Sequence, residues 1–287
     1  MIEADEVSVH IGQKALLNRV SIQVRPGEIV AVVGPNGSGK TTLFRVLCGD
    51  LSPSTGSVWL EGWCLEDWAS TEQARKRAVL PQAATLDFPF TVLEVAVMGR
   101  MPHLEGSEGT RDYAIARVGL DMAGVGELED RIYPTLSGGE QQRVQFARVL
   151  TQIGEQPSDG RRYLLLDEPT SNLDLAHQHR ILSTARNFAC ESTGVLAVVH
   201  DLNLAAQYAD RILVLKDGEE LTTGGPAEVF TEGVIEQAFE VGVQVIPHPV
   251  LDCPLIVPLP ETSAKSRTAQ IAGGSIFGPQ AGTSFGN

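Results

Sequence analysis

The chain has 287 residues, of which 43% are hydrophobic and 20% charged, and this composition excludes a fibrous or largely disordered protein. Acidic residues exceed basic ones, 36 against 22, so the formal charge of −14 makes nucleic acid an unfavourable partner. Apolar runs are far shorter than the roughly 18 to 20 residues of a membrane-spanning helix, and no signal pattern opens the chain. We therefore expect a protein that does not cross a membrane by itself.

The four cysteines form no C-x-x-C pair, which favours buried thiols in the reducing cytosol over a disulfide or zinc framework.

Strand-like runs open the chain, around residues 7–9 and 22–24, and the apolar run 29–33 after a Pro-Gly turn predicts a buried strand. Between about residues 85 and 135, apolar residues recur at helical spacing over 92–98 and 113–120, which predicts a helical insert.

From residue 163 onward, strand and helix patterns alternate, which is typical of a parallel sheet with helices packed on it. The expected elements are strands over 163–166, 195–199 and 212–215, and helices over 175–190 and 202–208. Residues 261–287 are mostly small, with charges only in the first seven, and predict a disordered tail.

The segment 34–41 matches the pattern G-x-x-x-x-G-K-[ST] between the expected buried strand and a helix-like run, which is the context that this motif requires. Its glycines let backbone N–H groups curl around a phosphate, and the helix N-terminus adds a positive dipole. Lys40 would reach the β- and γ-phosphates, and Thr41 would offer its hydroxyl to Mg²⁺. The residues of this predicted phosphate site are Gly34, Pro35, Asn36, Gly37, Ser38, Gly39, Lys40, Thr41 and Thr42.

Two acids follow the apolar run 163–166, so they should stand at the carboxyl end of a strand, where ligands bind in open α/β sheets. Asp167 suits the surroundings of a magnesium ion, and Glu168 is placed to polarise a water for attack on a γ-phosphate. The plain alternative is that Asp-Glu-Pro only ends the strand, because Pro169 cannot continue a ladder. The phosphate loop elsewhere in the chain favours the catalytic interpretation.

The run Leu-Ser-Gly-Gly-Glu-Gln-Gln-Arg at 136–143 predicts a second anion-binding helix start. With Gln82 before it and His200 after Asp167 and Glu168, the order of motifs resembles the nucleotide-binding subunits of ABC transporters over residues 2 to about 250.

The resemblance assigns roles to individual residues. It implies that Gln82, Glu168, His200 and Lys40 act in catalysis, and that Thr41, Gln82 and Asp167 hold Mg²⁺. Residues 171–174 would be the loop after the catalytic glutamate. The signature residues that would bind ATP are Ser137, Gly138, Gly139 and Glu140. The family's adenine-stacking aromatic falls just before Gly12, where this chain has His10 and Ile11, so an aromatic stack is not expected from that loop.

The resemblance also implies a fold and an assembly. The fold would be α/β, a RecA-like P-loop NTPase core over about 1–84 and 145–260 with an antiparallel β edge and an inserted α-helical subdomain over about 85–144. Members of this family pair head to tail, so a homodimer would clamp ATP between the phosphate loop of one copy and the Ser137 helix start of the other. Its partners would be transmembrane permease subunits, contacted around Gln82 and the helical insert, and indirectly a periplasmic binding protein. The chain would lie peripherally on the cytoplasmic face of the inner membrane.

The segments 90–94 and 99–103 look like those of ATPases from vitamin B12, ferric siderophore and hemin importers. A polar insertion over 154–162 and the run 173–178 favour the hemin branch, with siderophore or cobalamin import as the alternative. A soluble ABC ATPase outside transport is a further alternative, although the tandem units, basic surface or heptads expected of one are missing from the sequence. His177 and His179 are not expected to bind heme iron, because residues two apart on a helix point about 200° apart.

Overall fold

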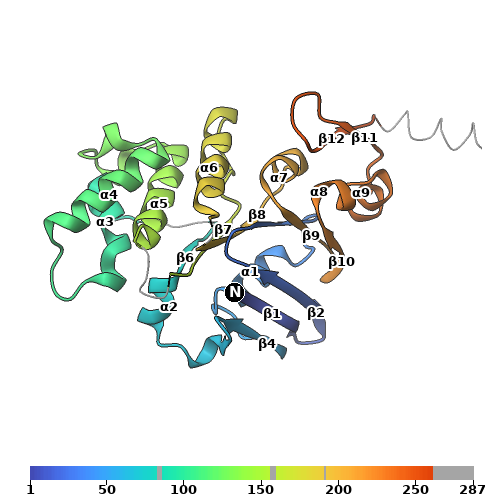
Figure 1. Ribbon diagram of the computed structural model, residues 1–287, viewed down its shortest axis with the longest axis horizontal. Helices are drawn as coiled ribbons and strands as arrows, with labels where there is room; N and C mark the ends of the chain where they lie inside the picture. The colour runs from blue at the N-terminus through green and yellow to red at the C-terminus, as the bar shows by residue number, and fades with distance from the viewer. Residues whose placement is uncertain (83–85, 156–159, 191, 261–287) are drawn as a thin grey trace, which may run out of the picture.

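The computed structural model describes residues 1–82, 86–155, 160–190 and 192–260, and Figure 1 shows their arrangement. The strands are β1 (Ile2–Ile11), β2 (Lys14–Val24), β3 (Ile29–Val33), β4 (Thr55–Leu60), β5 (Trp63–Cys64), β6 (Arg77–Leu80), β7 (Arg162–Asp167), β8 (Thr193–Val198), β9 (Arg211–Lys216), β10 (Glu219–Gly224), β11 (Val243–Pro247) and β12 (Pro254–Pro258). The α-helices are α1 (Lys40–Leu47), α2 (Ser70–Lys76), α3 (Val92–Val97), α4 (Thr110–Ala123), α5 (Gly138–Ile153), α6 (Leu175–Phe188), α7 (Leu202–Tyr208), α8 (Pro226–Val229) and α9 (Glu232–Phe239). Short 3₁₀ helices are η1 (Leu65–Asp67), η2 (Met98–His103), η3 (Gly126–Leu128) and η4 (Tyr133–Thr135).

The centre of the molecule is a sheet in the order β10-β9-β3-β8-β7-β6, in which every pair is parallel except β10 with β9. Strands β3, β7 and β8 are buried along their whole length, because layers cover both faces of the sheet. Val30 and Val32 of β3 enter one core, and Ile29, Ala31 and Val33 enter the other. This alternation follows from the two-residue period of a strand.

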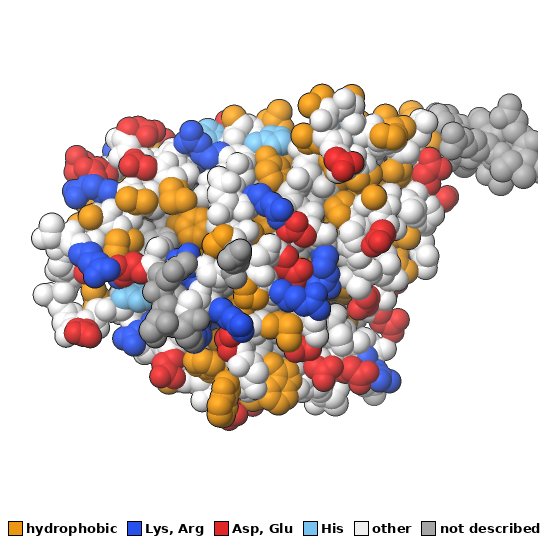
Figure 2. All heavy atoms as spheres, viewed as in Figure 1, with side chains coloured by type: hydrophobic (Ala, Val, Ile, Leu, Met, Phe, Trp, Pro, Cys, Tyr) orange, Lys and Arg blue, Asp and Glu red, His pale blue; other side chains and the backbone are white. Residues whose placement is uncertain are grey.

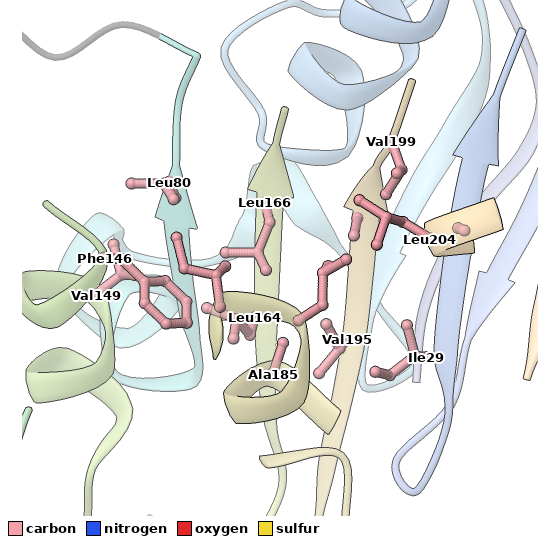
Figure 3. Packing of buried hydrophobic residues seen from close by; sticks show 14 of the residues in the cluster. Ile29, Leu80, Phe146, Val149, Leu164, Leu166, Ala185, Val195, Val199 and Leu204 are labelled. Carbon is pink, nitrogen blue, oxygen red and sulfur yellow. The ribbon is translucent and has the colours of Figure 1, made fainter. Parts of the chain in front are cut away.

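One face of the central sheet is covered by α1 and a second, antiparallel sheet in the order β2-β1-β4-β5. Figure 3 shows the core on the other face, where Phe146 and Val149 of α5, Ala185 of α6 and Leu204 of α7 meet the strand side chains. The fold is thus mixed α/β with an antiparallel β layer, as the sequence predicts.

The helices α3, α4 and α5 pack together beside β6. The 3₁₀ helix η2 joins them through Arg100, which is 3% exposed and pairs with Asp112 of α4 and with Glu155. His103, at the end of η2, lies 2.7 Å from the carbonyl oxygen of Gln152. The predicted division into a core and an insert of 85–144 remains a prediction, and its boundary at 144 falls inside α5.

Most elements expected from the sequence are present. The expected helix over 175–190 ends at Phe188, and the strand expected over 195–199 begins two residues earlier, at Thr193. The expectation of buried thiols is wrong for three of the four cysteines: Cys190 is exposed, Cys64 and Cys253 are half-buried, and only Cys48 is buried, although all four are free. The predicted tail, 261–287, lies outside the described residues. None of the helices in the described ranges combines the length and apolar character needed to span a membrane.

We predict that Gly99→Ala lowers the free energy of unfolding by about 1 to 3 kcal/mol, because a Cβ at residue 99 would lie 2.2 Å from the Arg148 carbonyl oxygen of α5. Gly233→Ala in α9 is the matched control, since a Cβ there meets nothing within 4 Å. Urea unfolding followed by circular dichroism measures both variants. Equal stability of the two variants would contradict the close packing of η2 on α5.

Candidate functional site

The phosphate loop leaves the end of β3 and turns directly into α1, whose first residue is Lys40. Two of its glycines are needed for close packing. A Cβ on Gly34 would lie 2.2 Å from the Leu215 carbonyl oxygen, and one on Gly39, where φ is 101°, would lie 2.9 Å from the Leu16 carbonyl oxygen. The strands β9 and β2 therefore hold the loop at its base, and no other residue type fits these two positions.

The outer part of the loop is open. Asn36, Gly37 and Thr41 are exposed, so backbone and hydroxyl groups there can reach a ligand. Lys40 is 5% exposed, and its Nζ donates to the carbonyl oxygens of Gly34 at 2.8 Å and Pro35 at 2.9 Å. Burial lowers the pKa of Lys40, and the charges of Glu168 and Asp167 partly oppose this effect. The lysine is thus held inside the loop that a phosphate would enter.

Asp167 ends β7 with its side chain inside the molecule, 4% exposed. Its Oδ1 is buried and has no hydrogen-bond partner in the described chain, and the same is true of Ser38 Oγ in the phosphate loop. Burial, and then the charge of Glu168, raise the pKa of Asp167 to about 6, although Lys40 and His200 oppose the rise. Unpartnered buried oxygens in an apolar protein interior are costly, so their presence at this strand end points to a ligand that supplies the missing contacts.

Glu168 follows β7 directly, and side chains from three other segments contact its carboxylate. His200 Nε2, from the end of β8, lies 2.5 Å from Glu168 Oε1. Gln82 Nε2, which follows β6, donates to Glu168 Oε2 at 2.8 Å, and Ser171 Oγ donates to the same oxygen at 3.2 Å. The structure therefore brings together three of the four residues expected to act in catalysis, with Lys40 close enough for the charge of Glu168 to affect its pKa.

The signature segment begins α5, as the sequence predicts. Ser137 is the N-cap, its hydroxyl accepts from the Glu140 N–H, and the Glu140 carboxylate accepts from the N–H and hydroxyl of Ser137. A Cβ on Gly138 would meet nothing within 4 Å, so the backbone at this helix start is open to an approaching molecule. Helix α5 packs on β6 and β7, whereas the phosphate loop belongs to β3, which β8 separates from β7.

Two contacts of the site were not assigned from the sequence. Gln142, one turn into α5, donates through Nε2 to the carbonyl oxygens of Glu168 at 3.2 Å and Pro169 at 3.0 Å. Ser171 binds the Glu168 carboxylate, as described above. Both residues lie inside the motifs at 136–143 and 171–174, but a motif does not show which of its side chains turns inward.

The two histidines of α6, His177 and His179, have protein partners. His177 Nδ1 lies 2.7 Å from Asp174 Oδ1, and His179 Nδ1 lies 2.8 Å from the Tyr208 hydroxyl. Within the described parts of the chain, no group of three or more His, Cys, Asp or Glu residues is placed to hold a metal ion. At the β1–β2 hairpin, His10 and Ile11 are both exposed, with Ile11 at 65%. Of the predicted insertion over 154–162, residues 156–159 lie outside the described residues.

The site combines two features. A glycine loop with a lysine joins a buried strand to a helix, and an Asp-Glu pair stands at the end of a nearby parallel strand. Together they define a P-loop nucleoside triphosphatase. Residues 17–171 match the sequence model of the ABC transporter family. This chain belongs to the ABC transporter family, as one of its ATP-binding proteins.

Close relatives and solved structures agree with this assignment. The chain is 53% identical over 274 residues to the hemin import ATP-binding protein HmuV of Gloeobacter violaceus, covering 96% of this chain and 100% of the relative. It is 47% identical over 257 residues to the protein of the same name from Myxococcus xanthus, covering 90% of this chain and 96% of the relative.

Among solved structures, an inward-facing transporter assigned to the metal-chelate type of ABC transporters has a TM-score of 0.75 and 25% identity, covering 91% of this chain and 98% of that one. The dimeric ATP-binding cassette MJ0796 with ADP and phosphate has a TM-score of 0.68 and 27% identity, covering 78% and 98%.

We predict that Asp167→Asn stabilises the nucleotide-free protein in a buffer without divalent cations, and that the gain depends on pH. Because the pKa of Asp167 is about 6 in the folded protein and 3.8 as its ordinary value, the folded state binds the proton more tightly than the unfolded state. Stability should therefore fall as pH rises from about 4 to 6 and stay lowered above that, by up to about 3 kcal/mol. The Asp167→Asn substitution removes this pH-dependent loss of stability.

Urea unfolding at pH 4.5 and pH 7.5, for the wild type and Asp167→Asn, measures the effect. Glu236→Gln, at an exposed position of α9, is the control and should change neither value. A gain in the Asp167→Asn variant that is as large at pH 4.5 as at pH 7.5 would contradict the assigned titration.

Proposed function

We propose that this chain is the ATP-hydrolysing, energy-coupling subunit of an ABC importer whose cargo is hemin. The observation that carries the enzymatic part is the meeting of Gln82, Ser171 and His200 on the Glu168 carboxylate. The identity of 53% and 47% to relatives named for hemin import supports the cargo.

The hydrolytic step uses Glu168 as general base. A water between Glu168 and the γ-phosphate gives a proton to the carboxylate while its oxygen bonds to phosphorus, and the bond from phosphorus to the β-γ bridging oxygen breaks, which leaves ADP and phosphate. His200, already 2.5 Å from the carboxylate, orients Glu168 and reaches the γ-phosphate, and Gln82 positions the water. Lys40 exchanges its two carbonyl contacts for the β- and γ-phosphate oxygens.

Mg²⁺ fits the same site. The unpartnered buried Oδ1 of Asp167 and the exposed hydroxyl of Thr41 are oxygen donors of the type that this hard cation prefers, and Gln82 adds an amide oxygen. These three residues would hold the ion, which supplies charge neutralisation at the phosphates when it is bound. Ser38 Oγ, also buried without a partner, is available to the nucleotide phosphates.

The active form we propose is a head-to-tail homodimer. In one chain, the signature helix start and the phosphate loop belong to different strands of the central sheet, because α5 packs on β6 and β7 whereas the loop follows β3. The open backbone at Gly138 suits an approach to the phosphates held by a second copy. The similarity to a cassette solved as a dimer supports this arrangement.

The permease partner would dock in a hollow of about 620 Å³ at the far end of α1. Leu51, Pro53 and Leu65 line it together with Arg77, whose guanidinium donates to the carbonyl oxygens of Leu47 and Cys48. The exposed side chain of Met101 lies on η2, which contacts α2 next to this hollow. The chain would therefore sit peripherally on the cytoplasmic face of the inner membrane, and a periplasmic binding protein would deliver cargo to the permease.

The cargo does not need to touch this chain. Since His177 and His179 are held by Asp174 and Tyr208, they give no iron site. Hemin is thus proposed as the cargo of the whole transporter.

Glu168→Gln is expected to reduce ATP hydrolysis at least about a hundredfold while leaving ATP binding intact, because the amide keeps the shape of the side chain but cannot take the proton. Phosphate release and binding of a fluorescent ATP analogue measure the two properties. Glu219→Gln, at an exposed position of β10, is the control for the loss of a carboxylate. Equal rates for wild type and Glu168→Gln would contradict the proposed role.

The cargo is tested by uptake and ATP hydrolysis in proteoliposomes that contain this chain, a candidate permease and its binding protein. We expect hemin to stimulate both activities, and a ferric siderophore and cobalamin to stimulate neither. Stimulation by one of the other chelates, without hemin, would assign the chain to that branch instead. Lys40→Ala should remove uptake with every cargo, since it removes the phosphate contact.

A further inference from the structure

A second, smaller hollow of about 240 Å³ lies on the antiparallel side of the molecule, apart from the nucleotide site. Its lining consists of Trp63 from β5, Asp67 from η1, Trp68, and Glu72 from α2. We call these four residues the tryptophan cage. Figure 2 shows hydrophobic and acidic side chains next to each other at the lower edge of this face, over α2 and β4.

The cage combines two features that favour a cation. The faces of tryptophan rings attract positive charge, and carboxylates add direct attraction. Asp67 and Glu72 are both exposed, and neither has an ion pair or side-chain hydrogen bond with the described residues. The residues that line the hollow include two acids and no base.

Trp68 shows that this segment already holds a cation in such a contact. The Lys76 ammonium lies 5.7 Å from the centre of the Trp68 ring. Lys76 is 8% exposed and does not line the hollow, so the cage keeps room for a second cation.

Trp68, one wall of the cage, is held in place before any partner binds. The Trp68 indole donates to the Leu60 carbonyl oxygen at 3.2 Å, and Gln73 donates to the carbonyl oxygens of Leu65 at 2.8 Å and Trp68 at 3.3 Å. A side chain that is already fixed loses little freedom on binding. Trp63, by contrast, is 68% exposed, which is a large apolar area to leave in solvent.

The position of the cage identifies the occupant. Residues of η1 and α2 line the large hollow on one side, with Leu65, Ser70 and Gln73, and the cage on the other, with Asp67 and Glu72. A protein segment seated in the large hollow therefore lies next to the cage. We propose that the cage binds an arginine or lysine side chain of the permease; this rests on the permease docking proposed above.

The first test uses the full-length chain and a probe peptide, acetyl-Gly-Arg-Gly-amide. The chain has three tryptophans, Trp59, Trp63 and Trp68, so its NMR spectrum has three indole N–H signals, which single substitutions assign. We expect the peptide to shift the signals of Trp63 and Trp68 and to leave that of Trp59, whose indole donates to Ser57 Oγ, unchanged. The neutral citrulline peptide should cause no shift.

The double variant Asp67→Asn with Glu72→Gln should bind the arginine peptide at least about fivefold more weakly, and salt should weaken binding to the wild type in the same direction. Equal shifts with the arginine and citrulline peptides would overturn the proposal. Shifts caused by phosphatidylcholine vesicles in place of the peptide would also overturn it, because the cage would then recognise a lipid headgroup.

The second test measures ATP hydrolysis with and without the permease. Trp63→Ala and the double variant should keep the basal rate of the isolated chain and require at least about fivefold more permease for half-maximal stimulation. Trp59→Ala, on the same sheet but outside the cage, should respond as the wild type does. Stimulation of the variants at wild-type permease concentration would overturn the cage proposal, whereas a wild type that no permease stimulates would overturn the proposed function itself.

Discussion

The parallel pairing of β3, β8, β7 and β6 is the constraint on which the nucleotide site depends. Parallel neighbours end at the same edge, so the residues that follow them meet there although they are far apart in the chain. The phosphate loop follows β3, His200 follows β8, Glu168 follows β7 and Gln82 follows β6. A slip of one register position in any of these strands would move its residue by about 3.3 Å and reverse its side chain, and the contacts on Glu168 would be lost.

The same constraint explains how much of the site the sequence could predict. Asp167 ends the buried strand β7 and Glu168 follows it directly, while Lys40 is tied to the buried strand β3 through the phosphate-loop motif, so motif and strand together fix where the three residues lie. The contacts of Gln142 and Ser171 could not be found in this way. Each depends on how a helix or loop is rotated against the strand end, and tertiary packing decides that rotation.

The elements of the fold differ in the same way in how well the sequence predicts them. Uninterrupted apolar runs predicted β3 at its observed bounds and β7 to within one residue at each end, because burial on both faces leaves little choice of residue. Strand β10 and the hairpin of β11 and β12 carry polar or proline residues on half-exposed edges, and their signals were too weak to be recognised in the sequence. The tryptophan cage belongs to this second group, since it arises where β5, η1 and α2 come together and no single segment contains its pattern.

The backbone of Glu168 has a further consequence. Its φ of 49° lies in the left-handed region, which costs a residue with a Cβ about 1 kcal/mol or more and which glycine adopts freely. The fold would therefore gain from glycine at the position where the proposed chemistry needs a carboxylate. Directed evolution that rewards only heat resistance should replace Glu168 early, and libraries screened for stability will need a parallel screen for turnover to keep the enzyme active.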